Sequence, residues 1–210
     1  MNSDNDEIAS AIAVKSGTCV ISGITKVDVI YLKDISCKLE FAGRIQNPVA
    51  VVSPQSNTAG KIFFFFVAPL TEIGDSAALI SNGNNLSLNG IAKDDGNGNT
   101  DIEWGESSCP EKAAVAKLKD AAGEETYFRS LDLLFKNITN DSEVTLLKSS
   151  PLTASVLITN SISVNTSSQR FDIWLNKTSL IKIADGGELN VCNTGFINFP
   201  RNENLTQYKT

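Results

Sequence analysis

The stretch Cys37-Lys38-Leu39-Glu40-Phe41 alternates apolar and charged residues without interruption. Because successive side chains of a strand point to opposite faces, this pattern predicts a half-buried strand with one face in water. On its N-terminal side, Val27, Val29 and Tyr31 alternate with Asp28, Ile30 and Leu32, which also predicts a strand. On its C-terminal side, the apolar run from Ile62 to Ala68 predicts a strand buried on both faces. The sequence therefore favours a β-rich body.

Short apolar segments separated by polar turns continue this character along the chain. Ser81-Asn82-Gly83-Asn84-Asn85 is typical of a hairpin, since Asn and Gly tolerate positive φ. No internal repeat of convincing period is visible. Besides the strands named above, the expected strands are Val49 to Val52, Ala77 to Ile80, Leu86 to Ile91, Val144 to Leu147, Ala154 to Ile158, Phe171 to Leu175, Leu180 to Ile183 and Leu189 to Cys192.

Two regions have helical spacing instead. Asp6 to Ser16 places Ile8 and Ile12 on one face, which predicts a short N-terminal helix. A helical insertion is expected around residues 108–136, because Ser108-Cys109-Pro110-Glu111 resembles a helix start and Glu125 to Lys136 carries apolar residues at helical intervals. The predicted fold class is α+β, an antiparallel sheet body with these helices. The expected layout is one domain, 1–210, with helix in 1–17, strands in 18–106, the helical insertion in 107–140 and strands in 141–210.

The overall composition excludes several kinds of chemistry. The 210 residues contain no histidine, which removes Ser-His-Asp and Cys-His catalysis and histidine-ligated zinc. A formal charge of −6 argues against nucleic acid as a partner, because a phosphate-backbone binder needs a basic surface. The acidic start from Asn2 to Glu7 is the reverse of a signal peptide. The chain is accordingly expected to be either a mature or trimmed secreted protein or a cytosolic one.

Four widely spaced cysteines, Cys19, Cys37, Cys109 and Cys192, favour the secreted alternative. Four cysteines allow three pairings, of which we expect Cys19–Cys37 and Cys109–Cys192, since the first two lie in neighbouring predicted strands. The alternative is four reduced and partly buried thiols.

The most distinctive motif runs from Asp95 to Glu106, where oxygen-bearing side chains recur in a glycine-rich loop. Such side chains are what a hard cation such as calcium requires. The spacing resembles that of an EF-hand loop, except that Thr100 replaces the glycine of the sharp turn. The alternative is a solvated turn that merely reverses the chain. The candidate metal ligands are Asp95, Asn97, Asn99, Asp101, Glu103 and Glu106.

Trp104, inside this motif, is a candidate ligand-binding residue that would stack on a sugar ring in a calcium-assisted lectin. Trp174 is expected in the core. Carboxylate pairs such as Glu103 and Glu106 keep a glycoside hydrolase formally open, although nothing else marks a substrate groove.

The strand Phe171-Asp-Ile-Trp-Leu175 followed by Gly186-Gly-Glu-Leu-Asn-Val-Cys192 resembles the ectodomains of type IV minor pilins and type II secretion pseudopilins. The likeness covers about forty residues with loose motifs. It implies a filament subunit whose apolar anchoring helix precedes this chain and has been removed, and it implies contact with a membrane only through that segment.

These observations together predict a non-enzymatic structural or adhesive subunit of a surface appendage such as a pilus. Its partners would be other protein subunits of an assembly, and its location extracellular or at the cell surface. The alternatives are a calcium-assisted carbohydrate-binding module, with glycans as partners, and a phage or viral capsid or tail protein.

Overall fold

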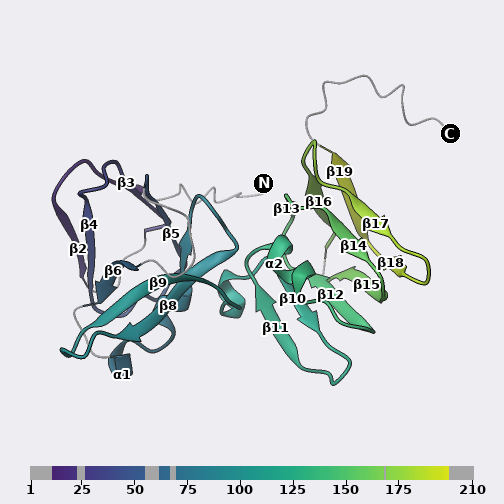
Figure 1. Ribbon diagram of the computed structural model, residues 1–210, viewed down its shortest axis with the longest axis horizontal. Coiled ribbons are helices and arrows are strands. Elements are labelled where there is room, and N and C mark those ends of the chain that lie inside the picture. Colours follow the sequence, from purple (N-terminus) through teal and green to yellow (C-terminus); the bar gives the residue numbers. More distant parts are fainter. Residues whose placement is uncertain (1–10, 23–26, 55–61, 67–69, 168, 199–210) are drawn as a thin grey trace, which may run out of the picture. The chain divides into compact units, whose positions relative to one another are not determined.

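The computed structural model describes residues 11–22, 27–54, 62–66, 70–167 and 169–198, and it divides the chain into two compact units. Unit 1 comprises residues 1–113 and unit 2 residues 114–210, and each is described by itself (Figure 1). Within the described ranges, no helix has the length and apolar character needed to cross a membrane.

Unit 1 is a single nine-stranded sheet with the order β1-β3-β5-β7-β8-β9-β6-β4-β2. Its strands are β1 (Ala11–Val14), β2 (Thr18–Ser22), β3 (Val29–Leu32), β4 (Lys38–Ala42), β5 (Val49–Val52), β6 (Ile62–Phe66), β7 (Ile80–Asn82), β8 (Leu88–Asp94) and β9 (Thr100–Glu106). The helical segments are short: α1 (Leu70–Ile73) and the 3-10 turns η1 (Gly74–Leu79) and η2 (Glu111–Ala113).

The strand order of unit 1 shows that the chain winds as a coil. Strands β1, β3, β5 and β7 pair in parallel on one side, and β2, β4 and β6 pair in parallel on the other. The hairpin β8–β9 pairs antiparallel with β7 and with β6, so it joins the two sides and closes one end of the coil. Strands β1 and β2 form the two edges at the opposite end.

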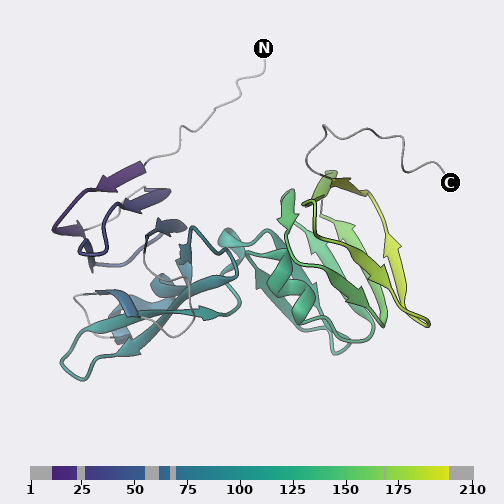
Figure 2. The same cartoon turned by 45° about the horizontal axis from the view of Figure 1, so that its top comes forward.

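Unit 2 winds in the same manner through three sheets, with the orders β11-β10-β12-β15-β18, β13-β16-β19 and β14-β17. Its strands are β10 (Ala116–Lys119), β11 (Glu125–Phe128), β12 (Ser142–Leu146), β13 (Ser150–Leu152), β14 (Val156–Ile158), β15 (Ser161–Thr166), β16 (Phe171–Leu175), β17 (Ile181–Ile183), β18 (Glu188–Val191) and β19 (Thr194–Asn198). Each coil adds one parallel strand to each sheet it reaches, which is the arrangement of a β-solenoid (Figure 2).

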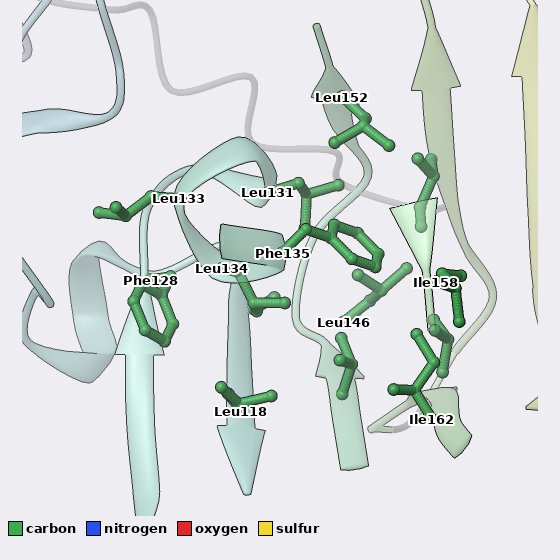
Figure 3. Close-up of a cluster of buried hydrophobic side chains, with 14 residues drawn as sticks. Leu118, Phe128, Leu131, Leu133, Leu134, Phe135, Leu146, Leu152, Ile158 and Ile162 are labelled. Atoms are coloured by element: carbon green, nitrogen blue, oxygen red, sulfur yellow. The ribbon is translucent and has the colours of Figure 1, made fainter. Parts of the chain in front are cut away.

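The core of unit 2 lies inside these coils, and α2 (Leu131–Lys136) closes its first end. Figure 3 shows Leu131, Leu134 and Phe135 of α2 pointing toward Leu146 and neighbouring side chains of the strands. The helix begins at Ser130, whose hydroxyl accepts a hydrogen bond from the Leu133 N–H at 3.4 Å. The antiparallel hairpin β10–β11 extends the first sheet beyond β12 at the same end.

These observations correct the predicted fold class. The protein is almost entirely β, and most strand pairs are parallel, so the α+β prediction with an antiparallel body is wrong. Most of the expected N-terminal helix lies outside the described residues, but Ala11–Val14 is a strand. Of the insertion predicted at 108–136, only the 3-10 turn η2 and helix α2 are helical.

The physical reason for the error at residues 108–136 is that tertiary pairing overrides local helix propensity. Ala116 and Leu118 alternate with Lys117 and Lys119, and the first two are buried while Lys119 is exposed. The alanine-rich sequence is therefore used as a strand. Gly123, at φ 86°, lies in the turn that follows it.

Candidate functional site

The predicted calcium motif is a β-hairpin turn followed by a strand. Residues 95–99 connect β8 to β9, with Gly96 and Gly98 at positive φ. The Asp95 carboxylate accepts hydrogen bonds from the N–H groups of Asn97 at 2.8 Å and Asn99 at 2.9 Å. These two bonds hold the pKa of Asp95 below its ordinary value of 3.8. The carboxylate is therefore already engaged in hydrogen bonds within the turn.

The remaining candidate ligands are dispersed along β9. Asp101 and Glu103 share one face of the strand, while Glu106 has the opposite parity and lies at the strand's end. Glu103 forms an ion pair with Lys93 on β8, at 2.7 Å between Nζ and Oε1. Within the described residues no group of three or more acidic or cysteine side chains could hold a metal ion. The structure does not bring the six candidates together.

The two tryptophans lie in the opposite environments from those predicted: Trp104 is buried and Trp174 is exposed. Trp104 is only 2% exposed, so its ring lies in the core of unit 1 and presents no face on which a sugar could stack. Trp174 is 38% exposed on β16, although the sequence suggested a core position. Of the two tryptophans, the exposed one therefore belongs to unit 2.

All four cysteines lie within the described residues, and no disulfide joins them in this structure. Cys37 is buried, and its thiol donates to the Val14 carbonyl at 3.3 Å. Cys109 is also buried, Cys19 is partly buried and Cys192 is exposed. The pairs Cys19–Cys37 and Cys109–Cys192 are not formed.

A polar surface that no sequence motif indicated lies on the outer face of the sheet β12-β15-β18. Parallel register aligns Glu143, Ser163 and Asn190 in one outward row. Together with their neighbours they line an open groove of 540 Å³. We call this surface the polar face; its lining residues are Asp141, Ser142, Glu143, Ser161, Ser163, Val164, Asn165, Asn190, Val191 and Cys192.

The polar face presents both donors and acceptors. The Ser161 hydroxyl donates to Glu188 at 3.3 Å across the β15–β18 pair. Asp141 adopts φ 57°, a left-handed conformation that is uncommon outside glycine and that occurs at the start of β12 beside the groove. Hydroxyl, amide and carboxylate groups of this kind can bind a hydroxyl-rich ligand through hydrogen bonds.

The last coil of unit 2, formed by β18 and β19, exposes side chains that earlier coils bury. In the first inward row Val144 and Val164 are 0% exposed, whereas their partner Val191 is 41% exposed. In the second sheet Ile173 is fully buried and its partner Phe196 is 38% exposed. The inner face of this coil is thus left uncovered by the described residues.

In unit 1, the inward side chains of strands β1 and β2 are likewise more exposed than those of the neighbouring strands. Ile12 pairs with the fully buried Ile30 but is itself only partly buried. Cys19 likewise pairs with the fully buried Leu39 and is partly buried. Each unit therefore has one end that a hairpin or helix closes and one end where apolar side chains reach solvent.

Sequence reasoning missed these features because both depend on register between distant strands. The polar residues of β12, β15 and β18 alternate with Val144, Ile162 and Val164, and that alternation is the only signal in the sequence. Comparison of the chain with family models, with curated proteins and with solved structures finds no match.

Proposed function

We propose that this protein is a non-enzymatic structural or adhesive subunit of an extracellular assembly, such as a surface appendage, and that it joins the assembly through the last coil of unit 2. The observation that carries the proposal is the exposure of Val191 and Phe196 on the inner face of that coil. Solenoid proteins need their terminal repeats covered, because an uncovered coil presents both apolar side chains and unpaired backbone groups.

The backbone of the last coil supports the same proposal. The N–H groups of Glu188 and Cys192 donate to the carbonyls of Asn160 and Val164, on the side of β15. Because hydrogen-bonding groups alternate along a strand, the N–H groups of Leu189 and Val191 point to the opposite edge. This edge can accept another strand, because proteins commonly bind one another by adding a strand to an exposed sheet edge.

Sedimentation velocity of the full chain at increasing concentration tests this function. We expect concentration-dependent association of the wild type, and a monomer for Phe196→Glu, because a carboxylate on the inner face would be buried by association. Leu157→Glu is the matched control, since Leu157 is 61% exposed but lies on β14, outside the last coil. A wild type that stays monomeric throughout would contradict the proposal.

The polar face favours a second candidate function, carbohydrate binding. Its hydroxyl, amide and carboxylate groups and its 540 Å³ groove fit a short oligosaccharide. A glycan array screened with wild type and with Glu143→Ala would test it. Binding that is lost in the variant supports the candidate, and an array with no bound glycan removes it.

A further inference from the structure

We propose that the partner of the last coil is a second copy of this chain, whose first coil, β1 and β2, continues the solenoid in parallel. The contact would be head to tail, with β1 beside β18 and β2 beside β19. This inference rests on the proposed function, because it names the partner at the same edge.

The two coils match in size. Strand β18 has 4 residues and β19 has 5, and the same is true of β1 and β2, respectively. The corners are residues 192–193 in one pair and 15–17 in the other, and each contains one residue in the left-handed conformation, Asn193 at φ 53° and Gly17 at φ 78°. Two edges of this form can lie against each other along both strands.

The inward side chains match in register as well. If Leu189 pairs with Ile12, then Val191 falls opposite Val14, because inward side chains recur at every second residue in both strands. The same number of residues separates Val191 from Phe196 as separates Val14 from Cys19, so Phe196 falls opposite Cys19. Of these six inward residues, Val14 is already buried within its own copy, and the other five are partly buried or exposed. All six meet without a shift between the sheets.

An outward row gives an independent argument. On sheet β13-β16-β19, Pro151, Trp174 and Ile197 are aligned by register and form an apolar ladder on the outer surface. The proposed pairing places Val20 next to Ile197 in this ladder. Val20 is 54% exposed and pairs with Glu40 in its own sheet, so its apolar surface has a polar neighbour there and an apolar one in the proposed contact.

A contact between two different surfaces of the same chain is heterologous, and it repeats from copy to copy. Such contacts close into a ring when the rotation allows and otherwise grow into a filament. Within the described residues, the hairpin β8–β9 joins the two sides of unit 1 at its other end, and helix α2 covers the apolar core at the other end of unit 2. The proposed contact therefore uses the ends whose apolar rows these elements do not cover.

Cross-linking at a single register position tests the inference. Phe196→Cys would place a thiol opposite the native Cys19 of the next copy, at a separation that a disulfide can span. Both this variant and its control carry Cys192→Ser to remove the exposed thiol. The control is Ile197→Cys, one position along on the opposite face of β19. Equal amounts of nitrogen-14 and nitrogen-15 protein are mixed, oxidised and digested, and linked peptides are identified by mass.

We expect a peptide joining positions 19 and 196, with both isotope-mixed forms present, at about ten times or more the yield of the control. Association of the wild type without this link would overturn the proposed pairing and leave the proposed function intact, whereas absence of association would overturn both. A link found only between identically labelled peptides would overturn the pairing, because Cys19 would then lie within the same copy. A link that forms only after removal of residues 199–210 would also overturn it, since the chain's own last residues would then cover the coil.

Discussion

Val164 and Val191 form a matched pair on which the account of the last coil can be tested quantitatively. They occupy the same inward row, paired directly between β15 and β18, and differ only in the coil to which they belong. Val164 is 0% exposed and Val191 is 41% exposed. Substituting each by alanine removes the same two methyl groups from two environments.

The expected costs follow from the burial. Each buried methyl or methylene contributes about 0.8 kcal/mol, so Val164→Ala loses about 1.6 kcal/mol of transfer free energy and a further cavity contribution, or about 2–3 kcal/mol in all. Val191→Ala loses roughly three fifths of that transfer term, about 1 kcal/mol, and its site opens to solvent rather than leaving a closed cavity. The free energy of unfolding should therefore differ between the variants by at least about 1 kcal/mol.

Urea unfolding at low protein concentration provides the assay, followed by fluorescence of Trp174 in a shared Trp104→Phe background so that the signal reports unit 2. Raising the protein concentration should increase the cost of Val191→Ala toward that of Val164→Ala, because association would bury Val191 and stabilise the folded state. Equal costs at every concentration would refute the reasoning, since Val191 would then be covered within the single chain.

Three further predictions concern turns and the candidate metal site. Hydrogen bonds lower the folded-state pKa of Asp95, so its contribution to stability is full above its unfolded pKa of 3.8 and is lost as pH falls through the lower folded pKa. The difference in melting temperature between wild type and Asp95→Asn should therefore shrink from pH 5 to pH 2. A difference that stays constant would contradict this origin. Gly187→Ala should destabilise unit 2 strongly, because a Cβ there would lie 2.4 Å from the Ile158 carbonyl oxygen. Gly186→Ala should cost only about 1 kcal/mol, because Gly186 has φ +83° but lies in open space. Equal urea midpoints for the two variants would contradict the close approach of Gly187 to Ile158. Millimolar calcium should leave the melting temperature unchanged, since Asp95, Glu103 and Glu106 do not converge, and a rise of several degrees would show that they can.

Local alternation predicted many of the strands but not how they pair. The pattern around Leu39 identified β4, and Phe171–Leu175 was predicted with the bounds that the structure shows. Parallel coiling was invisible because unequal numbers of residues separate Val144, Val164 and Val191, which nevertheless share one row. A solenoid with irregular coils leaves no fixed period in its sequence.

At the candidate site, too, the local turn could be predicted from the sequence but the positions of distant residues could not. Asn and Gly at positions 96–99 indicated a chain reversal, and the β8–β9 turn confirms it, because turn chemistry is local. The extended course of β9 after Thr100 then separates the acids that the spacing had suggested would converge. Neither the polar face nor the exposure of Phe196 could be predicted, because each depends on which strand lies beside which.

Whether the last coil of unit 2 is an assembly edge is tested most directly by hydrogen exchange of the Leu189 and Val191 amides at low and high protein concentration. We expect rapid exchange of both amides in dilute protein and slower exchange as the concentration rises. The Cys192 amide, already bonded to the Val164 carbonyl, should be protected in both conditions. Exchange of Leu189 and Val191 that is equally fast at all concentrations, or equally slow at all of them, would contradict the assignment of this coil as an assembly edge.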